Sequence, residues 1–481
     1  MLDPDRWGLL DGATANLGDD LHDYWGRYRP CFRTRTRDTS QYAYMYMRGQ
    51  LTMEDARNYV NIDRRLNGGD GQGVQQFMTD SPWSGQAVFR QIQADIRAQP
   101  LLQQGGILIL DESADTKAGE YSAGAGRQHN GRWGTVNVCQ VATCLAYAHP
   151  EARVWTLVDG ELFVPEAWFT RKYAPLRKAV GLPKERTFET KPQLGLKMIR
   201  RVRANGLPFE RVACDDLYGR GRSFRSALDA EGIKYAAEVP ADTRVYLKMP
   251  RVGVPRAKPG SHRSPTRLKV LSRHKSHTVR SLARSRHTQW QRVQVRHSER
   301  GILEADFVVQ RIWTLTTAMQ VRAEWLVIRR DLDGRLTFVL LNDAEDTPAA
   351  VLIQASCQRY FTERAYQDAK SELGWDDFQA RKYRAWEHEM ALTAASLWFI
   401  ASTKLKWSQL YARDPELARQ LEVEVLPALS TANVREMLQA VLPVPQLTRQ
   451  QARQVVAAHL VNRARSTSSR LKSQRVQDAS P

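Results

Sequence analysis

The segment ILILDES, residues 107–113, constrains the fold more than any other part of this 481-residue chain. Its four consecutive apolar residues predict a β-strand, and Asp111 follows them directly, so the strand delivers a carboxylate at its end. The strand-like run RVACDD ends in the same way at Asp215, and a third acid, Glu363, lies in the helix-like run QRYFTERAYQDAK. Together these three acids, remote in sequence, suggest one divided metal site.

The region around the first two acids alternates between strand-like and helix-like patterns. Between residues 107 and 240, three strand-like runs are followed by a helix, a strand, a helix and a strand, while the glycine-containing stretch 118–134 is interpreted as a linker. This order predicts an α/β fold, a mixed sheet with helices against its faces. Residues 1–100 are interpreted as short helices, which form either a DNA-reading module or a helical cap on the next domain.

A β-rich insertion is predicted before the third acid. Residues 241 to about 300 are basic, contain four prolines and lack a clear periodicity, so we expect much of this segment to be loop. Strand-like runs follow at 302–313, 323–343 and 347–353, and Asp333-Gly334 within the second of them predicts a hairpin. The chain then returns to helix from Ser356 onward.

These patterns divide the chain into five parts. We expect an N-terminal helical, DNA-end-binding domain (1–100), a first part of the core (101–240), the basic segment with the β-strand insertion (241–354), a second part of the core (355–406), and C-terminal helices with a basic tail (407–481). The tail after residue 465 is polar and poor in apolar residues, so it is either a phosphate-contacting or a solvated segment.

The charge of the chain favours a polyanionic partner. Lys and Arg total 71 against 52 Asp and Glu, which gives a formal net charge of +19 and a pI near 9.8. The excess is concentrated, because residues 251–300 contain 14 Lys or Arg and one acid. We therefore expect this segment to follow a nucleic-acid backbone, with Arg284 and Arg286 as candidate phosphate contacts; the alternative is a flexible loop without ordered contacts.

The cysteines and the apolar runs argue against a zinc-binding, a membrane or a secreted protein. The five cysteines are scattered without a Cys-x-x-Cys pair, which favours reduced thiols over a zinc site, and Cys139 and Cys144 are interpreted as core residues. No run of about 18 apolar residues occurs, so we expect neither membrane insertion nor secretion. The expected location is the cytoplasm.

The three acids suit phosphodiester chemistry. Two divalent cations beside a scissile phosphate activate the attacking oxygen and stabilise the leaving oxygen, and Mg²⁺ prefers carboxylate ligands. Asp111 would bridge both ions, and Asp215 and Glu363 would each complete one. Arg359 and Lys370, four residues before and seven after Glu363, share its helix face, a pattern that also fits a solvated helix with ordinary ion pairs.

Three blocks of the sequence, within residues 107–400, resemble the DDE transposases of bacterial insertion sequences, which have an RNase H-like catalytic core. The first block is the most specific, and its matching positions are Lys117, Gly119, Ser122, Gly124, Arg127, Gln128, Gly131, Asn137 and Gln140. The second is VACDDLYG, in which Asp215 matches the family pattern rather than Asp216 because of its spacing from Tyr218-Gly219. The third surrounds Glu363.

The resemblance implies that Asp111, Asp215 and Glu363 are the catalytic and metal-binding triad. Arg359, Glu363 and Lys370 match three letters of the Tyr-Arg-Glu-Lys signature of one branch, but its tyrosine position is occupied by Ser356. That signature contacts the backbone of the transposon end, so Arg359 and Lys370 are candidate DNA contacts. Lys117 and Arg127 are either DNA contacts or folding residues, and Trp290 in the basic segment is a candidate for stacking on a flipped base.

We therefore expect a Mg²⁺-dependent transposase with two metal ions, for which Mn²⁺ can substitute. It would bind the terminal inverted repeats of its element, cut at the ends and join the 3′-hydroxyls to target DNA. Its partners would be double-stranded DNA and a second copy of itself, since two ends must be synapsed, and it would be associated with the bacterial nucleoid. The alternatives are a domesticated DNA-binding regulator and a nuclease that cuts without strand transfer.

Overall fold

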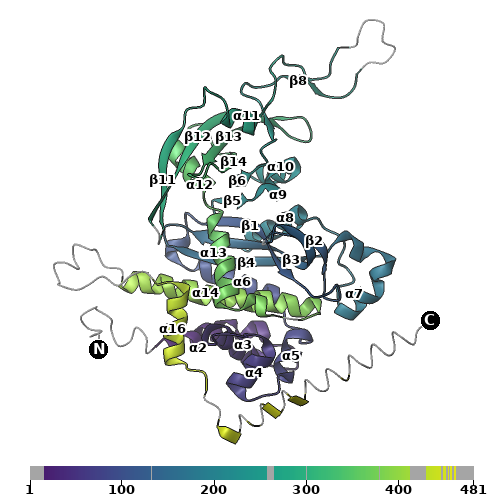
Figure 1. The fold of residues 1–481 in the computed structure, drawn as a ribbon, viewed down its shortest axis with the longest axis vertical. Helices are drawn as coiled ribbons and strands as arrows, with labels where there is room; N and C mark the ends of the chain where they lie inside the picture. The colour runs from purple at the N-terminus through teal and green to yellow at the C-terminus, as the bar shows by residue number, and fades with distance from the viewer. Residues whose placement is uncertain are drawn as a thin grey trace, which may run out of the picture.

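The computed structural model describes residues 16–131, 133–256, 265–298, 301–378, 380–411 and 429–445, with short stretches between 448 and 468. The helix predicted over 448–465 and the polar tail after it lie largely outside the described residues. Along the long axis of the molecule, a group of helices, a large sheet and a β-rich extension of that sheet follow one another (Figure 1).

Residues 17–97 form a series of amphipathic helices, as their pattern predicts. Their apolar faces share one core, in which Tyr28, Tyr46 and Ile92 are fully buried. The helices are α2 (Leu17–Tyr28), α3 (Ser40–Thr52), α4 (Tyr59–Asn67), α5 (Gln72–Thr79) and α6 (Gly85–Arg97), with 3₁₀ turns η2 (Arg29–Phe32) and η3 (Pro100–Leu102).

The centre of the molecule is a ten-stranded mixed sheet in the order β11-β12-β13-β14-β6-β5-β1-β3-β2, with β4 also paired to β3. Among the described residues, the neighbouring strands that pair in parallel are β1 with β5 and β5 with β6, and these three form the middle of the sheet. The strands of the first half are β1 (Ile107–Thr116), β2 (Gly126–Asn130), β3 (Thr135–His149), β4 (Val154–Phe163), β5 (Arg211–Cys214) and β6 (Lys234–Glu238). The expectation that 118–134 is only a linker is therefore wrong, because 126–130 form the edge strand β2.

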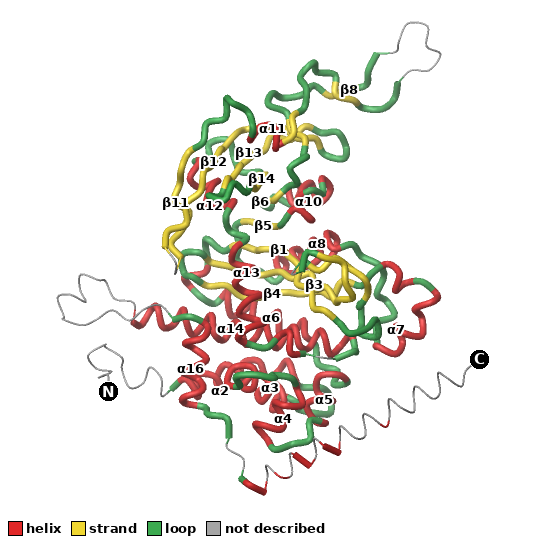
Figure 2. The backbone as a smooth tube through the Cα atoms, viewed as in Figure 1, coloured by secondary structure: helices red, strands yellow, loops and turns green. Residues whose placement is uncertain are grey.

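Helices surround the sheet, and Figure 2 shows them grouped around its central strands. Between the strands lie η4 (Glu166–Phe169), η5 (Arg171–Tyr173), α7 (Ala174–Val180), α8 (Lys191–Ala204), α9 (Asp216–Gly219) and α10 (Arg222–Ala230). After the insertion come α12 (Ala349–Ser356), α13 (Tyr360–Gln367), a π-helical turn (Asp368–Glu372), η7 (Trp375–Asp377), α14 (Tyr383–Tyr411) and α16 (Thr431–Val441). Of the helices in the described ranges, none combines the length and apolar character needed to cross a bilayer.

The insertion interrupts the core in sequence but extends the same sheet in space. Strand β14 pairs antiparallel with β6, matching Leu341 to Ala236. The strands β11 (Gln291–Ser298), β12 (Gly301–Leu315), β13 (Val321–Arg330) and β14 (Leu336–Leu341) then continue outward. The β13–β14 hairpin turns at Gly334, which has a φ of 85°, as the Asp-Gly pair predicts.

As expected, much of the described part of the basic segment is loop, and its regular elements are β7 (Arg244–Val245), β8 (Val252–Gly253), β9 (Lys269–Val270), β10 (His277–Thr278), α11 (Val279–Ala283) and β11. One expectation about the insertion is wrong. The run 347–353 does not form a strand, because α12 begins directly after Pro348. Proline suits a helix start, and Leu352, Ile353 and Ala355 place the apolar face of α12 in the core beneath the insertion.

A buried ion pair joins the insertion to the central strands. The Arg211 guanidinium, at the start of β5, donates from Nη1 and Nη2 to the two carboxylate oxygens of Asp343, after β14, over 3.0 and 3.1 Å. Both side chains are almost completely buried, at 7% and 1% exposure. The pair therefore fixes the end of β14 against β5 across the intervening strand β6.

Helix α14 lies between the sheet and helices α2–α5 (Figure 1), and its contact with α3 is polar at the centre. The buried Glu389 carboxylate accepts hydrogen bonds from Tyr46 Oη at 2.5 Å, Thr393 Oγ1 at 3.2 Å and Gln50 Nε2 at 3.3 Å. Burial raises the pKa of Glu389 to about 8, although the Tyr46 and Thr393 hydrogen bonds oppose this rise. The carboxyl group is therefore protonated in the folded protein at neutral pH.

This buried acid predicts a pH dependence of stability. The folded state retains the Glu389 proton between its ordinary pKa of 4.5 and about 8, whereas the unfolded chain releases it. The stabilisation from this proton is complete below about pH 4.5 and is lost as the pH rises to about 8. Relative to the wild type, Glu389→Gln should therefore gain thermal stability between pH 5 and pH 8, whereas the exposed control Glu54→Gln should not. An equal difference in Tm at both pH values would contradict the prediction.

The π-helical turn that follows α13 is held by two arginines from remote parts of the chain. Arg57, before α4, donates to the backbone oxygens of Ser371 and Glu372 over 2.8 and 2.6 Å. Arg435, in α16, binds the Glu372 carboxylate at 2.8 Å and the backbone oxygens of Leu51 and Met53 at 3.2 and 2.6 Å. The helix that bears Glu363 is therefore anchored by the N-terminal helices and by α16 together.

Candidate active site

Three adjacent parallel strands place acids side by side, each just after the residues that pair in parallel. Leu110 of β1 is paired with Cys214 of β5, and Cys214 with Ala237 of β6. The next residues along these parallel strands are Asp111, Asp215 and Glu238. Register alone therefore brings three carboxylates to neighbouring positions.

The turn after β5 is tight because of Gly219. Asp215 caps the short helix α9, and its Oδ1 accepts hydrogen bonds from the backbone N–H of Leu217 at 3.0 Å and of Tyr218 at 3.5 Å. A Cβ atom at Gly219 would lie 1.8 Å from the backbone oxygen of Glu238, so only glycine fits here. This close approach holds Asp215 and Glu238 in one corner of the sheet, while Asp216 points toward Arg220, 3.1 Å away.

Helix α13 adds Glu363 and an arginine at the centre of the acids. Arg359 lies at the N-cap position of α13, and each of its guanidinium nitrogens contacts a different carboxylate. The distances are 3.2 Å from Nε to Glu238 Oε1, 3.1 Å from Nη1 to Asp111 Oδ2, and 2.9 Å from Nη2 to Glu363 Oε1. The Arg359–Glu363 pair is the i, i+4 arrangement expected from the sequence.

The acids raise one another's pKa values. Burial raises the pKa of Asp111 to about 6, an effect that Arg359 opposes and the nearby Glu112 and Glu363 reinforce. The pKa of Asp215 is raised to about 7, first by burial and then by the negative charges of Asp111 and Glu112. Asp111 and Asp215 resist ionisation because too little positive charge lies near them. A bound cation would supply that charge.

The donor set fits hard divalent cations. Asp111, Asp215 and Glu363 offer carboxylate oxygens from two strands and a helix, the ligand type that Mg²⁺ prefers. Among the described residues, no three acid, histidine or cysteine side chains lie close enough to make a ready-formed metal site. In the structure the acids surround the Arg359 guanidinium instead, which contacts two of the three.

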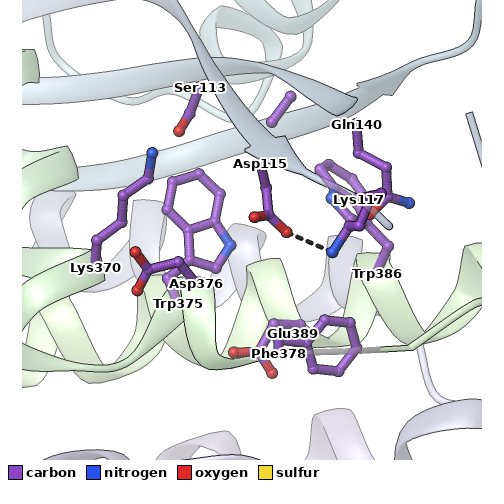
Figure 3. Close-up of a pocket in the computed structure, with 11 residues that line it drawn as sticks. Ser113, Asp115, Lys117, Gln140, Lys370, Trp375, Asp376, Phe378, Trp386 and Glu389 are labelled. Carbon is purple, nitrogen blue, oxygen red and sulfur yellow. Dashed lines mark hydrogen bonds and ion pairs between the residues drawn. The ribbon is translucent and has the colours of Figure 1, made fainter. Parts of the chain in front are cut away.

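Lys117 and Lys370 line a pocket farther along β1. Figure 3 shows Lys370 and Lys117 on opposite sides of this pocket, with Asp115 and the Trp375 ring between them and Trp386 beside Lys117. Lys117 is paired with Asp115, and its side chain is only 11% exposed. Lys370 Nζ donates to the backbone oxygen of Ala114 at 3.4 Å and lies 5.8 Å from the centre of the Trp375 ring. Both lysines therefore lie beside the acids without entering their cluster.

The other sequence-predicted DNA contacts lie elsewhere. Arg127 is exposed on the edge strand β2, paired to Val138 of β3. Arg284 and Arg286 are exposed at the end of α11, in the insertion. Trp290 is half-buried before β11, where the Arg330 guanidinium stacks 4.2 Å above its ring. The structure does not bring these residues to the acids.

Sequence reasoning missed Glu238. A signal was present, because the run IKYAAE ends in an acid just as ILILD and RVACD do. Ser356, at the tyrosine position of the signature, is buried, and its Oγ donates to the backbone oxygen of Ile353 at 2.7 Å. Ser356, which departs from the signature, therefore stabilises the last turn of α12.

Two comparisons with known proteins indicate the family of the chain. Residues 27–302 match the family described as DDE superfamily endonuclease, a range that includes Asp111 and Asp215 but ends before Glu363. A 338-residue stretch is 25% identical to a protein of Microchaete diplosiphon described as a probable transposase for insertion sequence element IS701, and it covers 69% of this chain and 73% of that protein.

Proposed function

Since the chain belongs to the DDE superfamily endonucleases, we propose that it is a DNA transposase that cuts at the ends of its element and joins the 3′-hydroxyls to target DNA. The observation that supports this most is that Asp111 and Glu363 share the Arg359 guanidinium, while Asp215 follows the neighbouring strand β5, where burial and the Asp111 charge raise its pKa. The relative described as a transposase supports the same reaction.

In this proposal the three acids form the catalytic site of an RNase H-like core and hold two Mg²⁺ ions, or Mn²⁺ in their place. The metal ions would activate the attacking oxygen and stabilise the leaving one. Asp111 would hold both ions, and Asp215 and Glu363 would each complete the ligands of one. Arg359, within the acidic cluster at the start of α13, and Lys370, in the π-helical turn beside it, would contact the DNA backbone through their positive charges.

Separate segments of the protein would contact different parts of the DNA. The N-terminal helices would read the terminal inverted repeat, and the insertion would follow the DNA backbone with Arg284 and Arg286. Lys117 and Arg127 would add backbone contacts along β1 and β2. A dimer would hold the two ends, and the protein would act at the bacterial nucleoid.

Purified protein, Mg²⁺ and a DNA carrying the inverted repeats that flank the gene would test the proposal. Joined products are expected. Nicked DNA without joined products would indicate a nuclease, and a shifted band without cleavage would indicate a DNA-binding regulator; either result would contradict the transposase.

The insertion should contribute to the salt dependence of DNA binding. If Arg284 and Arg286 each neutralise a phosphate, the double variant Arg284→Ala/Arg286→Ala should reduce the slope of log Kd against log salt by about 1.8. The exposed pair Arg200 and Arg203 on α8 offers a matched control, whose double alanine variant should leave the slope unchanged. Fluorescence anisotropy at several salt concentrations measures both, and an unchanged slope in the insertion variant would remove this segment from the interface.

A further inference from the structure

We propose that Arg359 occupies the cation position of the acidic cluster in the DNA-free protein, and that Glu238 holds this arginine when a cation displaces it. This inference rests on the proposed function, because it concerns the same metal site. It makes Arg359 a built-in competitor for the site and Glu238 a positioning residue.

The first argument is the geometry of the guanidinium. Its three nitrogens each contact one carboxylate, at 3.2, 3.1 and 2.9 Å. Arginine is a permanent cation with donors in fixed directions, so it binds several carboxylates at once where lysine would bind as a point charge. Two of these carboxylates, Asp111 and Glu363, belong to the metal triad, and they cannot direct the same oxygens at Arg359 and at a cation.

The second argument is the position of Glu238. It lies at the end of β6, one strand farther from Asp111 than Asp215 is. Its Oε1 contacts Nε of Arg359, whereas Asp111 and Glu363 contact Nη1 and Nη2. The Glu238 contact can therefore persist while the two others break. Arg359 would then keep a carboxylate partner, and both Nη groups would be released for another anion, such as a DNA phosphate.

The third argument concerns burial. The side chains of Arg359 and Glu238 are 24% and 23% exposed, so a guanidinium without a partner here would be incompletely hydrated. Retention by Glu238 lowers the free energy needed to release Asp111 and Glu363. Glu238 should therefore strengthen cation binding through Arg359, without itself being a ligand.

A thermodynamic cycle tests both parts in the absence of DNA and of catalysis. Ca²⁺ binding to the full-length protein is measured by titration calorimetry for the wild type, Arg359→Ala, Glu238→Gln and the double variant. Arg359→Ala should tighten Ca²⁺ binding about tenfold, because a charged competitor is lost. Glu238→Gln should weaken it several-fold in the wild-type background and leave it unchanged in the Arg359→Ala background.

Two further variants control for net charge and for folding. Arg220→Ala removes an exposed arginine that is paired with Asp216, beside the same cluster, and should leave the Ca²⁺ affinity unchanged. Arg359→Lys keeps the charge, and should tighten Ca²⁺ binding less than Arg359→Ala does. Equal tightening by Arg220→Ala would indicate a general charge effect and would overturn the competitor role.

The remaining outcomes are distinct. Unchanged or weaker Ca²⁺ binding by Arg359→Ala overturns the competitor role of Arg359. A weakening by Glu238→Gln that persists in the Arg359→Ala background overturns the positioning role, because Glu238 would then act on the cation directly. Ca²⁺ binding that Asp111→Asn leaves intact overturns the proposed function itself, since the metal would then bind elsewhere.

Discussion

Asp111→Asn is expected to lower the rate of DNA cleavage about a thousand-fold or more. In the proposed mechanism Asp111 would be a ligand of both metal ions, and metal-ion catalysis supplies several kcal/mol of transition-state stabilisation, each 1.36 kcal/mol being about tenfold in rate. Single-turnover cleavage of an end-containing DNA in Mg²⁺ measures the effect.

The same variant should fold normally and bind DNA as tightly as the wild type. Asparagine has nearly the volume of aspartate, and the substitution removes a charge that raises the pKa of Asp215. Asp216→Asn is the matched control, because Asp216 is next to Asp215 but 48% exposed and paired with Arg220. This control should cleave at the wild-type rate, and wild-type cleavage by Asp111→Asn would remove Asp111 from the catalytic site.

Asp343→Ala should destabilise the sheet by about 3–5 kcal/mol, since it leaves the buried Arg211 guanidinium without its carboxylate. The loss should appear first as faster hydrogen exchange of the β5 and β14 amides, which the pair joins. The double substitution Arg211→Met/Asp343→Leu removes both charges and should recover most of the stability.

The control for this prediction is an exposed ion pair. Asp55 is 74% exposed and binds Arg65 at 2.8 Å, so Asp55→Ala should change stability by less than about 1 kcal/mol. If Asp343→Ala were no more destabilising than Asp55→Ala, the pair would be a surface feature in solution and the insertion would be held by its strand pairing alone.

Local patterns predicted the features that local interactions determine. The apolar runs before Asp111 and Asp215 form strands because their side chains are buried in the central part of the sheet. The strand end predicted at Asp111 is wrong, because β1 continues to Thr116 by pairing with β3. The Asp333-Gly334 turn follows from the left-handed backbone of Gly334. The i, i+4 spacing of Arg359 and Glu363 likewise predicted their contact.

Other features depend on contacts between distant residues, so periodicity does not reveal them. A short apolar run such as 347–353 suits a strand and a helix equally, and the helix forms because its apolar face covers the insertion. The pairing of β14 with β6 joins residues about a hundred positions apart, so the sequence left the insertion's place in the sheet open. The role of Glu238 depends on this long-range register and on an arginine from α13.

The two arginines that anchor the π-helical turn are synthesised at very different times. Arg57 and the acids Asp111, Asp215, Glu238 and Glu363 are all made before Arg435, the last anchor of the turn. A nascent chain that has emerged only to residue 400 holds every acid but lacks the α16 contact that secures the end of their helix. The helix that bears Glu363 therefore gains its second anchor only after Arg435 has left the ribosome.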